Sequence, residues 1–294
     1  MKNLVTITCL RDLSQIILQA KSIEMFLNEK EHWIIINEYT EDKNKWIDIL
    51  KPLYHKNKLH LLFLDDFMPL NSERGYVWSK YTSYSRQLYL KFLAFSYIKQ
   101  DYLILDSKNF FTMKTDLEQW KNITGCGKLI KYNSPGYEHF TDAIDTYEKY
   151  IGVSRKKCYL TPHTPFVFRK NALTSILSRY DGMDNFIKWF ESIRLPNLEK
   201  HKGTWCENLG WHSEFLLYSC FLSEKDMISS DGYLYLTLWK QDHKYFKEKC
   251  IKGFLQKIPI MGIHIQLLRI IRNNKNDLCF VNNFLKSLKI DHEL

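Results

Sequence analysis

The segment Tyr102-Leu-Ile-Leu-Asp-Ser-Lys-Asn-Phe-Phe111 decides the fold that this sequence predicts. Its first four residues are apolar, and they end at Asp106, which is followed by Ser107, Lys108 and Asn109. A short apolar run that stops at a polar cluster indicates a buried strand followed by a turn. Asp106 is therefore either a group that caps the turn or a carboxylate presented at the end of a sheet.

Three similar apolar runs precede this segment, at residues 4–10, 33–36 and 59–64, and each ends at polar residues. Helical patterns separate them, over residues 43–50 and 83–98 and in a first helix with a one-faced set of apolar residues, namely Ile16, Ile17, Ala20, Ile23 and Phe26. We expect Asp12 or Ser14 to cap that first helix. Strands that alternate with helices predict an α/β fold with a mostly parallel, Rossmann-type sheet flanked by helices.

The carboxyl ends of these strands predict where a ligand would bind. Parallel sheets collect their ligands at that edge. The polar residues that follow the strands, among them Arg11, Asp12, Asn37 and Asp106, should therefore line one rim. The strand pattern alone therefore predicts a candidate site at this rim.

The second half of the chain is less regular. It predicts helices over residues 171–180, 185–193 and 213–222, the last capped by Ser213, and strands over residues 233–239 and 258–265. A terminal helix over residues 278–288 has Asp277 available as its cap. Because no linker, repeat or low-complexity segment interrupts the chain, one continuous domain with a C-terminal elaboration is the simplest interpretation.

The composition narrows the class of protein. The net charge is +9, from 42 Lys and Arg against 33 Asp and Glu, which favours anionic partners such as nucleotides or phospholipid surfaces. The basic residues form no run of five or six, so we expect no nucleic-acid partner. The seven cysteines are odd in number and lack C-x-x-C spacing, which indicates neither a disulfide framework nor a structural zinc site.

The expected location is the cytoplasm. No stretch approaches the roughly 18 apolar residues of a transmembrane helix. The apolar start of the chain is too short for the core of a signal peptide. Peripheral association at the inner face of a membrane stays compatible with the basic charge. The sequence also lacks the motifs of a serine hydrolase, a P-loop enzyme, a zinc protease and a dinucleotide-binding protein.

Two segments resemble GT-A glycosyltransferases: Ser85-Arg-Gln-Leu-Tyr-Leu-Lys91 and Leu105-Asp-Ser-Lys-Asn-Phe110. The opening Thr6-Ile-Thr-Cys-Leu-Arg-Asp12 resembles the first strand and nucleotide loop of the same family. The resemblance is closest to a poorly characterised bacterial and viral group with a degenerate Asp-x-Asp motif. It covers residues 4–111 well and residues 161–168 and 211–218 more loosely.

This resemblance implies a GT-A-like domain over residues 1–294, with a nucleotide-sugar-binding half at 1–120 and an acceptor half at 121–294. It implies a glycosyltransferase of polysaccharide biosynthesis that moves a sugar from a nucleotide-sugar to a glycan or lipid-linked acceptor. Two alternatives stay open. One is a non-catalytic glycan-binding or assembly protein on a degenerated fold, and the other is a nucleotidyltransferase.

The family motif also predicts the centre of the site. A typical Asp-x-Asp directs two carboxylates to one divalent cation, Mn²⁺ or Mg²⁺, which binds the diphosphate of the donor. In this sequence Asp106 occupies the first position and Lys108 the second. Either Asp106 binds a metal ion with the help of water and His264, or Lys108 replaces the metal ion and contacts the diphosphate itself.

The remaining candidates follow from the same resemblance. Arg11, Asp12 and Asn37, or Glu38 beside it, are expected at the nucleotide. Gln87 and Lys91 are four residues apart on one helix and therefore share a face that could meet the donor sugar or its phosphates.

Glu214 is the candidate base on the acceptor side, with His212 an equally available neighbour. If Glu214 takes the acceptor proton, the reaction inverts the anomeric centre. If no carboxylate faces the acceptor, the reaction retains it.

Overall fold

The computed structural model describes residues 1–126, 129–130, 141–152, 159–160, 164–200, 213–223, 226, 228–230 and 234–292. The chain has the α/β fold that the sequence predicted, with a mostly parallel central sheet flanked by helices. It divides into two compact units. The Asp106 unit comprises Lys2–Asp66, Leu105–Gln119 and Gly232–Leu294, and the Glu214 unit comprises Met1, Phe67–Ile104 and Trp120–Asp231. Both units draw residues from either side of residue 120, and the single-domain interpretation stays a prediction.

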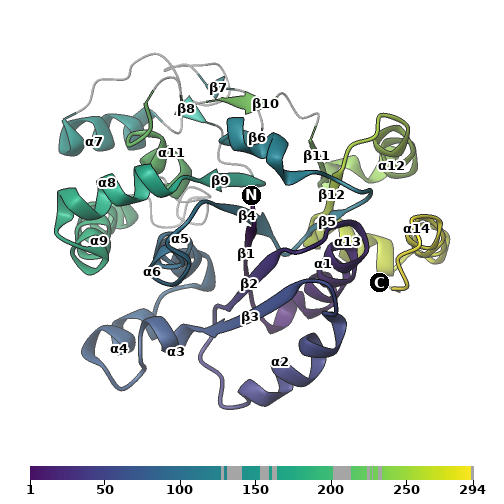
Figure 1. Cartoon of the computed structure of the whole chain (residues 1–294), viewed down its shortest axis with the longest axis horizontal. Helices are drawn as coiled ribbons and strands as arrows, with labels where there is room; N and C mark the ends of the chain where they lie inside the picture. The colour runs from purple at the N-terminus through teal and green to yellow at the C-terminus, as the bar shows by residue number, and fades with distance from the viewer. Residues whose placement is uncertain are drawn as a thin grey trace. The chain divides into compact units, whose positions relative to one another are not determined.

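The Asp106 unit is built on three parallel strands. β1 (Asn3–Thr8) pairs with β2 (Glu31–Ile36), and β2 pairs with β3 (Lys58–Phe63), with Thr8, Ile36 and Phe63 in register at their carboxyl ends. The helices α1 (Leu13–Phe26) and α2 (Lys43–Leu50) connect them (Figure 1). Their buried apolar residues form one core with the strands, made of Ile16, Ile34, Ile36, Trp46, Leu50 and Phe63.

A second, smaller sheet completes this unit. β11 (Tyr235–Leu238) runs parallel to β12 (Ile260–Ile263), and β12 runs antiparallel to β5 (Asn109–Phe111). The 3-10 helix η6 (Lys240–Tyr245) and the helix α12 (Phe246–Leu255) join β11 to β12, and α13 (Ile265–Arg272) and α14 (Lys275–Ser287) follow. These elements share a second core with the opposite face of α1, through Leu18, Phe110, Met261, Leu267 and Leu285.

Gly262 sets how closely β12 can approach the turn before β5. A Cβ atom at this position would lie 2.9 Å from the carbonyl oxygen of Lys108 and 3.0 Å from Nδ2 of Asn109. Contacts below 3.0 Å require the backbone to move, so only glycine fits here without a shift. The glycine thus lets the backbone of Lys108 lie directly against β12.

The Glu214 unit combines short strands with most of the aromatic residues. The first part of β4 (Tyr102–Asp106) pairs antiparallel with β9 (Phe166–Phe168), which also pairs with β6 (Gly125–Cys126). β10 (Ser229–Ser230) runs parallel to β6, and β7 (Leu129–Ile130) pairs with β8 (Tyr159–Leu160). In the Asp106 unit, the 3-10 helix η2 (Lys51–Leu53) precedes β3, and the helix α3 (Leu64–Phe67) follows it. The 3-10 helix η3 (Leu117–Asn122) precedes β6.

The helices of this unit are α4 (Glu73–Ser79), α5 (Ser83–Leu93), α6 (Phe95–Ile98), α7 (Thr141–Ile151), α8 (Lys170–Tyr180), α9 (Met183–Lys200) and α11 (Glu214–Ser219). Their core is largely aromatic. Phe168 stacks on Tyr218 with ring centroids 4.4 Å apart, and Phe166 stacks on Phe215 at the same separation. Such offset ring pairs stabilise a core beyond the area that they bury.

Several predicted boundaries were wrong, each for a local reason. The first strand ends at Thr8, because residues 10–12 form the 3-10 helix η1 (Leu10–Asp12). The strand predicted over residues 258–265 ends at Ile263, because His264 caps α13. Asn274, rather than Asp277, caps the terminal helix. The side chain of Asp12 makes no capping hydrogen bond to α1, and it turns to Ser107 instead.

Candidate functional site

The turn between β4 and β5 carries Asp106, Ser107 and Lys108, and two local hydrogen bonds fix its shape. Oδ1 of Asn109 accepts the backbone N–H of Asp106 at 2.9 Å. Oδ1 of Asp106 accepts the backbone N–H of Lys108 at 3.3 Å. Short Asp and Asn side chains stabilise turns in this way. The turn is therefore preorganised by the residues that form it.

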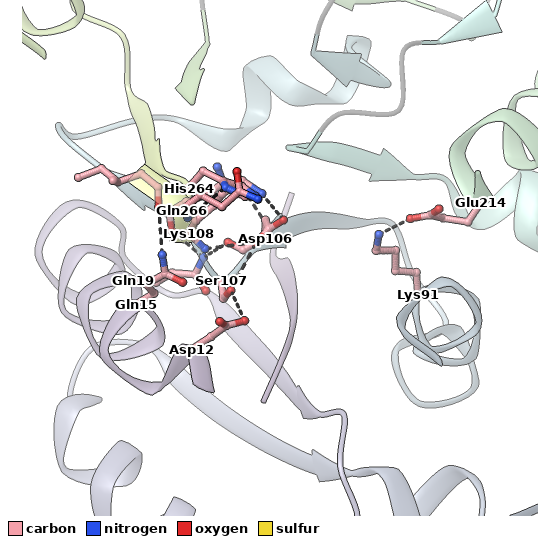
Figure 2. A network of polar contacts seen from close by, with 12 residues as sticks. Asp12, Gln15, Gln19, Lys91, Asp106, Ser107, Lys108, Glu214, His264 and Gln266 are labelled. Carbon is pink, nitrogen blue, oxygen red and sulfur yellow. Dashed lines mark hydrogen bonds and ion pairs between the residues drawn. The ribbon is translucent and has the colours of Figure 1, made fainter. Parts of the chain in front are cut away.

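Lys108 and Asp106 form an ion pair at this turn (Figure 2). The side chain of Lys108 is 13% exposed and that of Asp106 is 36% exposed. The ammonium of Lys108 also lies 5.4 Å from the ring centroid of Trp239, within the range of a cation–π interaction. One carboxylate and one aromatic ring therefore hold the ammonium, and neither buries it completely.

Asp12, which follows β1, lies beside the same turn. The hydroxyl of Ser107 donates to Oδ2 of Asp12 at 3.1 Å. Burial raises the pKa of Asp12 and the charge of Asp106 raises it further, while the Ser107 hydrogen bond and the charges of Arg11 and Lys108 oppose the shift. The structure thus brings the carboxylates of Asp12 and Asp106 together at the strand ends.

Three polar side chains on one face of α1, Gln15, Gln19 and Ser22, hold the turn and the strands next to it through hydrogen bonds. Nε2 of Gln19 donates to the carbonyl oxygens of Asp106 at 2.9 Å and Asn109 at 2.7 Å. Nε2 of Gln15 donates to the carbonyl oxygen of Ile263 at 3.0 Å, and Oγ of Ser22 accepts the N–H of Phe111 at 3.0 Å. All three side chains are buried and successive on one helical face. Buried polar groups with such partners specify one position for the backbone they bind.

A chain of buried hydrogen bonds supports Gln19 in turn. The hydroxyl of Thr6 donates to Oε1 of Gln19 at 2.7 Å and lies 3.0 Å from Nε2 of His32. Nδ1 of His32 lies 2.6 Å from the hydroxyl of Tyr54. The network thus runs from Tyr54, in the loop before β3, through His32 of β2 and Thr6 of β1 to Gln19. It orients the Gln19 amide toward the turn.

The other strand-end candidates occupy different environments. Arg11 is 63% exposed and lies 3.8 Å from Asp12. Asn37 is buried, and its backbone N–H donates to the carbonyl oxygen of Thr8 at 2.7 Å. Oε1 of Glu38 accepts the N–H of Leu10 at 2.8 Å, which ties the end of β2 to the loop after β1. Their predicted contacts with a nucleotide stay predictions.

His264 reaches the turn from the start of α13. Its Nδ1 accepts the N–H of Gln266 at 3.3 Å, and its ring stacks on Trp239 with centroids 4.4 Å apart. Burial lowers the pKa of His264 and the charge of Lys108 lowers it further, against the charge of Asp106. His264 is thus close to both charged groups, although the sequence pattern placed it within a strand.

The side chains at this turn do not fit a divalent cation. Across the described residues, no group of three or more His, Cys, Asp or Glu side chains is placed to hold a metal ion. The second position of the motif holds the ammonium of Lys108, which cannot ligate a cation and which pairs with Asp106. The roles of Asp106 and His264 as metal ligands therefore stay predictions that this donor set does not support.

Lys91 and Glu214, both predicted as site residues, pair with each other in the Glu214 unit (Figure 2). Their side chains are only 10% and 3% exposed. The ammonium of Lys91 also lies 4.6 Å from the ring centroid of Phe215. Gln87, one turn earlier on α5, is half-buried. His212, the other candidate on the acceptor side, lies outside the described residues.

Sequence reasoning missed Trp239, Gln15 and Gln19. Ser107 belongs to the polar cluster that was expected at the rim, but no role of its own was predicted for it. Trp239 is 131 positions away from Lys108 in a chain with 8 tryptophans, so no local pattern distinguishes it. Gln15 and Gln19 are glutamines, a residue type that is mostly exposed, so residue type alone did not predict that they are buried.

No protein-family model matches the chain, and no curated protein matches it by sequence. Solved structures of LgtC do match it in fold. An active-site mutant of LgtC has a TM-score of 0.52 and 13% identity, over 97% of this chain and 95% of the LgtC chain. This is a GT-A-like fold.

A second LgtC structure, of the galactosyltransferase in complex with donor and acceptor sugar analogues, matches the GT-A-like fold equally broadly. Its TM-score is 0.50, with 13% identity over 97% of this chain and 95% of that chain. At this identity the similarity shows the fold alone.

No helix within the described part of the chain is long and apolar enough to cross a membrane.

Proposed function

We propose that this chain is a glycosyltransferase that moves a sugar from a nucleotide-sugar to a glycan or lipid-linked acceptor. The observation that carries the proposal is the Lys108 ammonium at the carboxyl end of β4, paired with Asp106 and next to Asp12. In an α/β sheet this edge is where ligands bind. The GT-A-like fold, shared with a galactosyltransferase solved with donor and acceptor sugar analogues, supports a sugar donor as that ligand.

On the donor side, the nucleoside diphosphate is the leaving group. Negative charge grows on it as the bond to the sugar breaks, and a fixed positive group nearby lowers the barrier. Lys108 supplies an ammonium held by Asp106 and Trp239. Arg11, Asp12 and Asn37 are the proposed contacts to the nucleotide, since they follow the neighbouring strands β1 and β2.

On the acceptor side, Glu214 is the proposed base of an inverting reaction. Its carboxylate is 3% exposed and paired with Lys91, so it can accept a proton only in a state in which that pair opens. A retaining reaction needs no such base, and Glu214 then serves the core alone. The proposal covers both stereochemical outcomes.

The surface of helix α12 supports a lipid-linked acceptor. Ile251, Phe254 and Leu255 are 49%, 48% and 72% exposed and lie on one face, at positions i, i+3 and i+4. Residues 240–257 contain six lysines and two acidic residues. Exposed apolar side chains among lysines favour the surface of an anionic bilayer. We therefore propose that the protein works in the cytoplasm with α12 resting on the inner membrane face.

A screen of UDP-, GDP- and TDP-sugars tests the function. A donor present at 100 times its Kd should stabilise the protein by about 2.7 kcal/mol, which raises the melting temperature. We expect one of these donors to raise the melting temperature of the wild type and to release its nucleoside diphosphate over time. Asp106→Ala should reduce both effects.

Asp48→Ala is the matched control, because it removes an exposed carboxylate from α2. It should respond to the donor as the wild type does. If no donor stabilises the wild type at roughly millimolar concentration, where any Kd of physiological use would register, the proposed function is wrong.

A further inference from the structure

The charge at the strand end differs by two units from that of an Asp-x-Asp site. With an aspartate in place of Lys108, the cluster would hold Asp12, Asp106 and that third carboxylate against Arg11 alone. With Lys108 present, two cations face two carboxylates, so the cluster is neutral before any ligand binds. The difference equals the charge of one divalent cation.

Lys108 is also held as a metal ion would be, at a fixed position. Its ammonium pairs with Asp106 and faces the ring of Trp239, and its backbone N–H donates to Asp106. The carbonyl oxygen of Lys108 packs closely against Gly262 of β12, where even a Cβ atom would come within 2.9 Å of it. β12 therefore limits movement of the Lys108 backbone. A lysine restrained at both ends loses little further conformational freedom when it binds an anion.

The ammonium retains donors for a ligand. An ammonium has three N–H groups, and Asp106 accepts from it. The side chain is 13% exposed, which leaves the group reachable from solvent. A phosphate oxygen can therefore join Asp106 and the Trp239 ring around the same ammonium, without breaking the ion pair.

We propose that Lys108 takes the place of the divalent cation, so that this site binds a nucleoside diphosphate without a metal ion. Asp106 is then a positioning residue that aims Lys108, and it does not ligate a metal. Trp239 is the second positioning residue. This inference rests on the proposed function and defines how its donor site binds the diphosphate.

Titration calorimetry with UDP, GDP and TDP tests the inference, in buffer with a chelator and again with Mn²⁺. We expect at least one nucleoside diphosphate to bind the wild type with a Kd that changes less than about twofold between the two buffers. Lys108→Arg should keep this binding. Lys108→Gln should weaken it about tenfold or more in both buffers, because a charge-assisted hydrogen bond is lost.

Lys108→Asp is the decisive variant. It should bind the diphosphate only when Mn²⁺ is present, since the cation restores the lost charge. Circular dichroism checks that it folds, and Lys108→Gln and Lys108→Arg carry the test if it does not. Asp106→Asn should bind more weakly than the wild type but with the same indifference to the chelator.

The outcomes separate the two proposals. Wild-type binding that appears only with Mn²⁺ overturns the inference and leaves the glycosyltransferase proposal standing. Wild-type binding that Lys108→Gln leaves unchanged also overturns the inference. If none of the three nucleotides binds in either buffer, and no nucleotide-sugar stabilises the protein, the proposed function itself fails.

Discussion

At the residue scale, the burial of Lys91 and Glu214 decides how much their ion pair matters for stability. Both side chains lie almost completely inside the Glu214 unit, and the Lys91 ammonium also faces the ring of Phe215. Removal of one partner leaves the other charge buried without compensation, which typically costs about 3 kcal/mol or more. The pair therefore binds α5 to α11 whatever else Glu214 does.

We expect Glu214→Gln and Lys91→Met each to lower the free energy of unfolding by about 3 kcal/mol, and the double variant to lose less than the sum. Urea unfolding measures this. Lys2→Met is the matched control, because it breaks a pair with Glu31 in which Lys2 is 64% exposed, and it should cost about 1 kcal/mol or less. Equal losses in control and buried variants would contradict the expectation.

The same variants address the proposed base. Glu214→Gln keeps the shape of the side chain and removes its capacity to accept a proton. If Glu214 is the base, kcat falls in this variant well beyond the effect of Lys91→Met at matched folded fraction. If the two variants lose activity in parallel with stability, Glu214 has only a structural role.

At the scale of elements, α12 is amphipathic in a way that its packing explains only in part. Phe246, Cys250 and Gly253 face the core, while Ile251, Phe254 and Leu255 remain exposed beside Lys247 and Lys252. An apolar facet among lysines is the arrangement that interfacial helices use. The edge contact of Phe254 with Phe284 fixes this facet against α14.

We expect the protein to sediment with vesicles that contain phosphatidylglycerol, and less with vesicles of phosphatidylcholine alone. Because each lysine near an anionic surface contributes about 1 kcal/mol, salt should weaken the association. The variant Ile251→Ser with Leu255→Ser should bind roughly tenfold less, since it removes apolar area.

Val77→Ser is the control for this experiment, because Val77 is 43% exposed on α4 and lies in the other unit. It should leave vesicle binding unchanged. Equal binding to both vesicle types, or equal binding by both variants, would show that α12 does not contact lipid.

At the scale of the whole molecule, the buried histidine network couples folding to pH. His32 is fully buried, and burial lowers its pKa to about 3. In the unfolded chain the same group titrates near pH 6.5, so only the unfolded state takes up a proton between these values. Because the pKa of His32 is lower in the folded state, the contribution of His32 to stability is complete above pH 6.5. That contribution is lost as the pH falls toward 3.

A change from pH 7.5 to pH 5 should therefore lower the free energy of unfolding by about 2 kcal/mol through His32. Urea unfolding at the two pH values measures the loss. His32→Gln provides the comparison, because it keeps a hydrogen-bonding side chain that does not titrate. His60 and His264, whose pKa values are also lowered, act equally in both proteins. The same pH effect in wild type and variant would contradict this account.

The sequence by itself determined the strands β1 to β4, the helices α1 and α2, and the polar residues at the strand ends. These features depend on local periodicity and on the rule that parallel strands present their carboxyl ends at one edge. That rule was enough to predict that Asp12 and Asp106 lie near each other. The replacement of the second motif carboxylate by Lys108 was likewise visible in the chain.

Only the tertiary structure decided what surrounds these residues. It brought Trp239 and His264 to Lys108, because β12 pairs antiparallel with β5 over a separation of about 150 residues. It also buried Gln15 and Gln19, a residue type that is mostly exposed, and gave their amides backbone carbonyl acceptors in β12 and in the turn. Periodicity along a chain encodes which side chains share a face, but the partner of a buried polar group or charge is chosen by packing between distant segments.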